Sequence, residues 1–100
     1  MYYGTVARYR IKPGHEEKFL EQMKSFEESP PAGWIYTTLF RGANDPTEIW
    51  MSTVFESEEH YKKNAESPEM DRDYRAMLEN LQAEPDWHDG HVIHEAMRKG

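Results

Sequence analysis

Hydrophobic and polar positions alternate with a period of two in three parts of the chain, which predicts three β-strands. The expected strands are residues 2–12, 34–41 and 47–55, and a fourth is expected over residues 91–97. In the first strand, one face carries Tyr3, Thr5, Ala7, Tyr9 and Ile11. In the third strand, one face carries Thr47, Ile49, Met51, Thr53 and Phe55. In the second strand, both faces are fairly apolar, so we expect both to be covered. One face carries Trp34, Tyr36, Thr38 and Phe40, and the other carries Ile35, Thr37, Leu39 and Arg41.

Apolar residues at helical spacing predict three helices, over residues 15–28, 57–66 and 68–82. Pro13-Gly14 ends the first strand before the first helix, and Asp89-Gly90 predicts a turn before the last strand. Ser57 is expected to cap the second helix, because its hydroxyl can accept a hydrogen bond from a free backbone N–H. Ser67 followed by Pro68 predicts the start of the third.

The order of these elements is β-α-β-β-α-α-β, and no repeat or linker divides the chain. We therefore expect residues 1–100 to form a single α+β domain. If the last two helices form one broken crossover, the fold is the ferredoxin-like split β-α-β arrangement, with a four-stranded antiparallel sheet and helices on one face. The other face of the sheet would carry Val6, Trp50 and Val54 beside Arg8 and Arg10. Such an apolar face predicts a homodimer in which a second copy covers it.

Composition narrows the class of partner. Lys and Arg number 12 against 19 Asp and Glu, and this net charge of −7 disfavours nucleic acid and anionic membranes as main partners. There is no apolar run of about 20 residues and no signal-peptide pattern, which favours a cytoplasmic location. The chain has no cysteine, so disulfides, thiolate metal sites and cysteine nucleophiles are excluded.

Several motifs carry a family resemblance. They are IKPG before an acidic helix, the strand GWIYTTLFRG, and the strand end and helices of FESEEHYKKNAESPEMDRDY. From about Tyr2 to Met97 the chain resembles the antibiotic biosynthesis monooxygenase family of dimeric α/β barrels. The resemblance implies a homodimer whose two sheets pack into a barrel, with a pocket in each subunit between its own sheet and helices. Members of this family include cofactor-independent oxygenases of aromatic polyketides, haem-degrading enzymes and quinol oxygenases, and others have no known activity.

The haem-degrading branch has an asparagine on the first strand, a tryptophan at the end of the third and a haem-ligating histidine on the long helix. Those places hold Ala7, Phe55 and Tyr74 here. Because all three depart from the pattern, haem degradation by that mechanism is not expected. Tyrosine ligates haem iron in other proteins, so haem binding stays open.

Candidate site residues are mostly aromatic. We expect Tyr9, Phe55, Tyr61 and Tyr36 to contact a small aromatic ligand, because an apolar pocket with a few hydroxyls suits such a molecule. Tyr74 and His60 are the candidate catalytic residues, His60 as a general base. Two plainer alternatives remain open. The rings fill the core, and His60 is a solvated residue of an otherwise polar helix.

Two further sets of residues have ligand-binding chemistry. His88, His91 and His94 lie near Asp86 and Asp89, a composition that suits zinc. Alternation along a strand would separate His91 from His94, so we expect no metal site. Arg8 and Arg10 on the presumed interface would either pair with acidic residues of the partner subunit or bind an anion within the barrel.

Two functional hypotheses follow. The first is a monooxygenase that acts on a small aromatic or quinol-type metabolite without a bound cofactor. The second is a non-catalytic dimeric barrel that binds a small ligand or has a structural role. A polar side chain positioned to accept a proton from the substrate would favour the monooxygenase over the non-catalytic protein.

Overall fold

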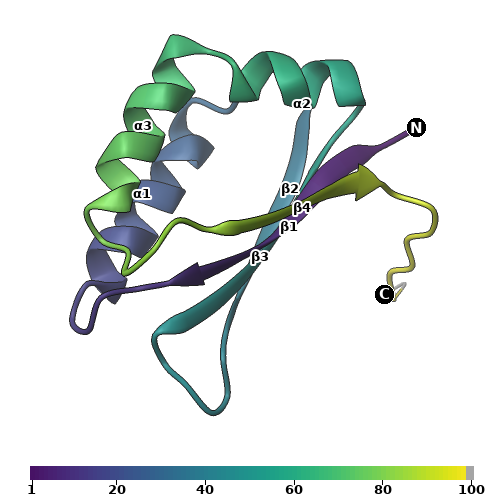
Figure 1. Ribbon diagram of the computed structural model, residues 1–100. Helices are drawn as coiled ribbons and strands as arrows, with labels where there is room; N and C mark the ends of the chain where they lie inside the picture. Colours follow the sequence, from purple (N-terminus) through teal and green to yellow (C-terminus); the bar gives the residue numbers. More distant parts are fainter. Residues whose placement is uncertain (99–100) are drawn as a thin grey trace.

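The computed structural model describes residues 1–98 and shows one sheet with helices on one of its faces (Figure 1). The strands are β1 (Tyr3–Arg10), β2 (Trp34–Arg41), β3 (Glu48–Phe55) and β4 (Asp86–His91). The helices are α1 (Glu16–Glu28), α2 (Glu58–Ala65) and α3 (Pro68–Leu78). The four-stranded sheet has the order β2-β3-β1-β4, and every neighbouring pair is antiparallel. The predicted α+β, ferredoxin-like fold is therefore confirmed.

The core lies between the sheet and the helices. It contains several residues of the predicted faces of the first and third strands, one buried residue from each of α1 and α3, and one residue after α3. Its buried members are Ala7, Tyr9, Ile11, Phe19, Ile49, Met51, Met77 and Leu81. Strand alternation puts every second residue of β1 and β3 on the helix side, which is why period two located this core correctly. The predicted caps of α2 and α3 are also confirmed, because Ser57 and Ser67 accept backbone hydrogen bonds from His60 and Met70.

The prediction for the last strand is wrong. Instead of residues 91–97, β4 comprises Asp86–His91, and the expected Asp89-Gly90 turn lies inside it. Pairing with β1 places Trp87 opposite Ala7 and Gly90 opposite Gly4. The free edge of β1 satisfies the backbone of these residues, and this long-range pairing outweighs the local turn propensity of Asp-Gly.

The third helix ends earlier than predicted, at Leu78 instead of residue 82. Leu81 leaves the helix and forms a bridge with Ile11, and the Gln82 backbone N–H donates to the Arg10 carbonyl at 2.8 Å. These contacts extend the edge of β1, so the chain turns out of the helix to reach it.

The predicted faces of β2 are partly wrong because of a β-bulge. The register shifts between Trp34 and Tyr36, so that Trp34 lies opposite Phe55 and Tyr36 lies opposite Val54. Trp34 therefore shares the helix side of the sheet with Thr37 and Leu39, while Tyr36 lies in register on the other face. A bulge adds one residue to a strand and reverses the alternation beyond it.

The outer face of the sheet is apolar and open in the single chain. Val6, Phe40 and Trp50 on it are 55%, 56% and 42% exposed. Val54, which was expected to be covered there by a second copy, is already buried within the single chain, since β3 is an internal strand and the large Tyr36 is its register neighbour. The second strand is likewise not covered on both sides within one chain. Both observations leave the homodimer as a prediction.

Arg8 on this face has an acidic partner within the chain. Arg8 Nε lies 2.9 Å from Glu48 Oε1, which also accepts a hydrogen bond of 2.9 Å from the Trp50 indole. Arg8 therefore does not need an acidic residue of a partner for its charge. The cluster orients the Trp50 ring across the outer face.

Replacing Trp50 by glutamate is expected to dissociate the homodimer, because the new carboxylate would be desolvated in the interface and would lie beside Glu48. Light scattering at micromolar concentration should give twice the chain mass for the native protein and the chain mass for Trp50→Glu. The control is Lys63→Glu, which adds the same residue at an exposed position of α2. A native protein that is monomeric at this concentration would rule out the dimer.

Among the described residues no helix is both long enough and apolar enough to cross a membrane.

Candidate functional site

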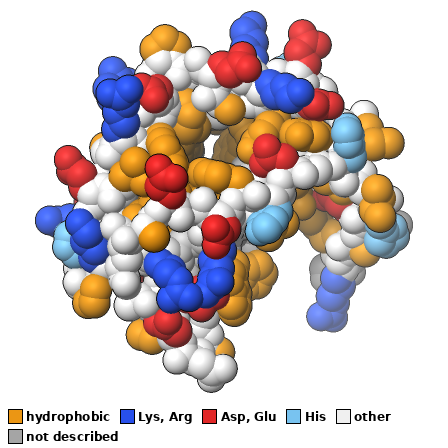
Figure 2. Space-filling model, in the orientation of Figure 1, with side chains coloured by type: hydrophobic (Ala, Val, Ile, Leu, Met, Phe, Trp, Pro, Cys, Tyr) orange, Lys and Arg blue, Asp and Glu red, His pale blue; other side chains and the backbone are white. Residues whose placement is uncertain are grey.

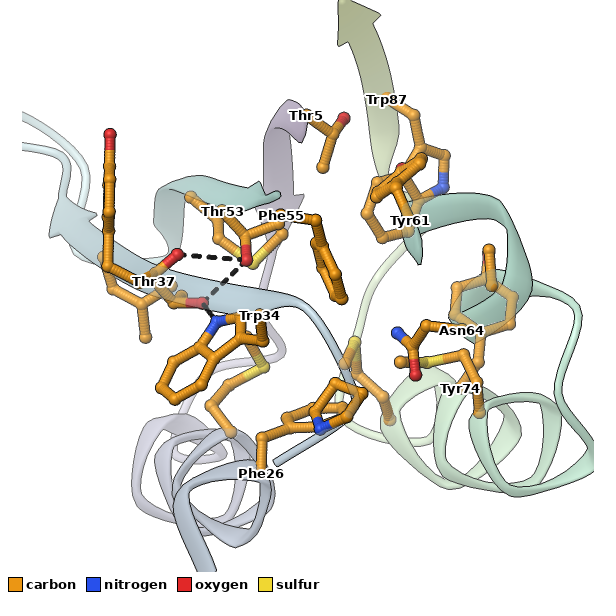
Figure 3. Close-up of a pocket in the computed structure, with 18 of the residues that line it drawn as sticks. Thr5, Phe26, Trp34, Thr37, Thr53, Phe55, Tyr61, Asn64, Tyr74 and Trp87 are labelled. Carbon is orange, nitrogen blue, oxygen red and sulfur yellow. Dashed lines mark hydrogen bonds between the residues drawn. The ribbon is translucent and has the colours of Figure 1, made fainter. Parts of the chain in front are cut away.

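A cavity of about 810 Å³ lies between the helix side of the sheet and the helices. Figure 2 shows hydrophobic side chains gathered around a hollow in this part of the molecule. Most of the wall is apolar or aromatic, with side chains from β1, β2, β3 and β4 on one side and from the three helices on the other (Figure 3). A cavity of this size and character suits a small aromatic molecule.

The structure brings Tyr9, Phe55, Tyr61 and Tyr74 together in the cavity wall. The Phe55 and Tyr61 rings meet edge-on, with centroids 5.7 Å apart. The Tyr74 ring lies 6.2 Å from that of Trp87. The alternative in which these rings simply fill the core fits Tyr9, which is 1% exposed. It fits Tyr61 and Tyr74 less well, because both are only half-buried and border an open cavity.

Tyr9 has little freedom to act on a ligand through its hydroxyl. That hydroxyl donates to the Met51 Sδ at 3.5 Å, a weak acceptor. Burial raises the pKa of Tyr9 far above its ordinary value, and the neighbouring Tyr61 and Tyr74 add to the rise. Tyr9 therefore stays protonated and contributes mainly its ring.

Tyr36 contributes to the site through its backbone. It borders the cavity, but its register position is on the outer face of the sheet. Its carbonyl accepts a hydrogen bond of 3.3 Å from the Thr53 hydroxyl. The β-bulge in β2 explains why alternation alone placed this residue wrongly.

His60 is separated from the other candidates. It is not part of the cavity wall. Its Nδ1 shares a hydrogen bond of 2.7 Å with the Ser57 hydroxyl, and its backbone N–H donates to the same oxygen at 3.1 Å. The ring packs over Gly33, where a Cβ would lie 2.5 Å from the imidazole. These contacts place His60 in the cap of α2 and against Gly33, outside the cavity wall.

Two groups of polar side chains interrupt the apolar wall. On the β2 side, the Trp34 indole donates to Thr37 at 2.9 Å, and the Thr37 and Thr53 hydroxyls share a hydrogen bond of 2.8 Å (Figure 3). On the β4 side, the Tyr61 hydroxyl donates to Asp89 Oδ1 at 2.9 Å, and Thr5 lies in register beside Asp89. Burial raises the pKa of Tyr61 well above its ordinary value, and the hydrogen bond to Asp89 adds to this rise.

Sequence reasoning missed the contributions of Trp34, Thr5, Trp87 and Asp89 to this wall. Trp87 and Asp89 were missed because the last strand was expected to begin only at residue 91, after a turn at Asp89-Gly90. The one available signal was Trp87, Asp89 and His91 at alternate positions, which β4 places on one face.

The candidate zinc ligands do not converge. In register, Asp86 and His88 lie opposite Arg8 and Val6, while Asp89 and His91 lie opposite Thr5 and Tyr3, on the other face of the sheet. His91 Nε2 approaches Glu58 Oε1 at 3.5 Å. Within residues 1–98 no group of three or more His, Cys, Asp or Glu is arranged to hold a metal ion.

Comparison with known proteins places the chain in a family. The model of the antibiotic biosynthesis monooxygenase family matches residues 2–77. No curated protein matches the sequence significantly.

Solved structures share the fold at low identity. A conserved protein from Methanosarcina mazei is 18% identical, with a TM-score of 0.80 over 91% of this chain and 92% of that one. A Chloroflexus aurantiacus protein described as an antibiotic biosynthesis monooxygenase is 19% identical, with a TM-score of 0.77 over 97% and 98% of the two chains. SnoaB, a cofactor-independent oxygenase from Streptomyces nogalater, is 14% identical, with a TM-score of 0.77 over 94% and 95%. The fold of these proteins and the match over residues 2–77 agree with the architecture described above, and the chain belongs to the antibiotic biosynthesis monooxygenase family.

Proposed function

We propose that the protein is a monooxygenase that oxidises a small aromatic or quinol-type metabolite with O₂, without a bound cofactor, and that it acts as a homodimer. The observation that carries this proposal is the aromatic cavity of about 810 Å³ in a chain of this family. The similarity to SnoaB, a cofactor-independent oxygenase, supports the same reaction class.

The chemistry needs little from the protein beyond this cavity. An anthrone-type substrate that loses a proton becomes a carbanion or enolate, which reacts with O₂ to give a quinone and water. An apolar wall excludes bulk water and strengthens the few polar contacts inside. In this proposal Phe55, Tyr61 and Tyr74 stack on the substrate, and the Tyr74 hydroxyl holds one of its oxygens.

A non-catalytic ligand-binding protein is the second candidate. It is favoured by the Tyr9 and Tyr61 hydroxyls, which are already engaged with Met51 and Asp89, and by the position of His60 outside the cavity. Oxygen uptake with a panel of phenols, quinols and anthrones separates the two. Uptake above the rate without protein supports the oxygenase, and binding without uptake supports the second candidate.

Replacing Tyr74 by phenylalanine is expected to lower kcat by about tenfold or more while the ring and the fold remain. The described residues offer the Tyr74 hydroxyl no side-chain hydrogen-bond partner, so its removal should change the free energy of unfolding by less than about 0.5 kcal/mol. Oxygen uptake and urea unfolding measure the two quantities. The control is Tyr2→Phe, which removes the same hydroxyl from an exposed ring. A Tyr74→Phe protein with native kcat would remove Tyr74 from the catalytic site.

A further inference from the structure

Thr5 is a buried polar residue in the cavity wall, and its hydroxyl forms no regular hydrogen bond. Thr5 is 4% exposed and lines the cavity. Its Oγ1 has no partner with full hydrogen-bond geometry in the part of the chain that the structure describes, although a weaker interaction with the Tyr61 hydroxyl lowers the pKa of Tyr61 against the larger effect of burial. Leaving a buried hydroxyl unsatisfied is costly, and most such groups in proteins are paired. By contrast, the Thr37 and Thr53 hydroxyls elsewhere in the same wall are both hydrogen-bonded.

Two other polar groups lie at the same end of the cavity. Asp89 is the register partner of Thr5 on the neighbouring strand, so both lie on the helix side of the sheet. The Tyr61 hydroxyl donates to Asp89 Oδ1 at 2.9 Å. Figure 3 shows Thr5 and Tyr61 approaching this end of the cavity from the sheet and from α2.

The charges nearby make this end of the cavity electronegative. Asp89 forms no salt bridge within residues 1–98, and two basic side chains of α2 and β4, Lys62 and His91, lie against Glu58 instead, although Lys62 also lines the cavity. Lys62 pairs with Glu58 at 2.7 Å, and His91 approaches the same carboxylate. A carboxylate without a cation repels anionic ligands and accepts hydrogen bonds from neutral donors.

We propose that Thr5, Tyr61 and Asp89 form a subsite that binds the hydroxyl of a neutral aromatic alcohol, such as a phenol or an enol, and accepts its proton. This inference rests on the proposed function and names the substrate class of the same cavity. An aromatic carboxylate or phosphate ester would bring a second negative charge beside Asp89 and is expected to bind more weakly. Asp89, which the sequence suggested only as part of a possible zinc site, is in this proposal the group that takes the substrate proton.

The proton follows a short path. The ligand O–H bond breaks and its proton binds the Tyr61 oxygen, while the Tyr61 proton moves to Asp89 Oδ1. The ligand keeps the electron pair as a phenolate or enolate, whose oxygen accepts a hydrogen bond from Thr5. Asp89 is exposed and passes the proton to water, and no oxidant is needed until the anion meets O₂. The raised pKa of Tyr61 agrees with this path, because a tyrosine that stays neutral relays a proton instead of keeping a charge.

A matched pair of ligands tests the subsite without any turnover. Titration calorimetry with 1-naphthol and 1-naphthoate, which have the same ring system, should show a preference for the alcohol of about tenfold or more in the native protein. Asp89→Asn removes the charge and should reduce this preference to within about threefold. Thr5→Val should weaken 1-naphthol binding by about tenfold, because it removes the donor but keeps the shape.

Controls distinguish a local effect from a general one. Thr37→Val is the same substitution in the same wall, where the hydroxyl is already paired, and should change 1-naphthol affinity by less than about threefold. Thr5→Val should not lower the melting temperature, since it replaces an unsatisfied buried hydroxyl by a methyl group.

Steady-state kinetics provide a second test of the subsite. With a substrate that the native protein oxidises, Asp89→Asn and Tyr61→Phe should each lower kcat more than they change KM, and the double variant should lose no more than either alone. If no substrate is oxidised, the proposed function fails while the naphthol titration still decides the subsite. If oxidation occurs but the naphthol preference is absent or unchanged by Asp89→Asn, the subsite is overturned and the oxygenase stands. Failure of the native protein to bind 1-naphthol also overturns the subsite.

Discussion

Replacing Gly4 by alanine is expected to destabilise the protein by on the order of 3 kcal/mol or more, because a side chain there collides with backbone. A Cβ at Gly4 would lie 1.9 Å from the Thr53 carbonyl oxygen on β3. Gly4 is opposite Val54 in the central pair of strands, so relief requires β1 and β3 to separate. Urea unfolding of Gly4→Ala against the native protein measures the loss.

Gly90 offers a matched control in the same sheet. It is the register partner of Gly4 on β4, and a Cβ there meets no atom of the described chain within 4 Å. Gly90→Ala should therefore change the free energy of unfolding by less than about 1 kcal/mol, with stabilisation the expected sign because glycine weakens a strand interior. If both variants lost the same free energy of unfolding, the close approach of Gly4 to β3 would not be the reason that position 4 requires glycine.

Replacing Phe19 by alanine is expected to cost about 3–5 kcal/mol of unfolding free energy. Phe19 is the fully buried residue of α1, and its ring meets the Tyr9 ring edge-on with centroids 5.1 Å apart. Alanine would leave a void at the contact that holds α1 against β1, where a packed core relaxes only partly. Urea unfolding of Phe19→Ala beside the native protein measures this loss of unfolding free energy.

Phe26→Ala on the same helix separates stability from ligand binding. Phe26 is half-buried and lines the cavity, so its loss widens a space that is already open. We expect a smaller loss of stability than for Phe19→Ala and a weaker affinity for 1-naphthol, because one aromatic surface is missing. If both variants lost stability equally, α1 would be held by its whole apolar stripe instead of by Phe19.

The fold was largely predictable from local patterns. Period two located three strands, and the serine caps located the starts of α2 and α3, because both signals depend only on residues close in the chain. The resemblance carried by residues from Tyr2 onward agreed with the family match over residues 2–77.

The site was predictable only in part. Tyr9, Phe55, Tyr61 and Tyr74 all line the cavity, since each lies on the core side of a strand or helix that its own sequence predicts, and their roles in binding and catalysis stay predictions. Tyr36 also borders the cavity, although its register position is on the other face of the sheet, and His60 lies outside the wall. A bulge reversed the alternation of β2, and His60 took the position that its hydrogen bonds to Ser57 and its packing on Gly33 require.

By itself the sequence determined the element order, the helix starts and the face of β1 and β3 that turns inward, because these follow from spacing along the chain. The tertiary structure alone decided where β4 begins. The open edge of β1 supplies hydrogen bonds to Asp86–His91, and no local signal records that an edge fifty residues or more away in sequence is free. The same pairing brings Asp89 beside Thr5 and Tyr61, so the polar end of the cavity exists only once the sheet is assembled.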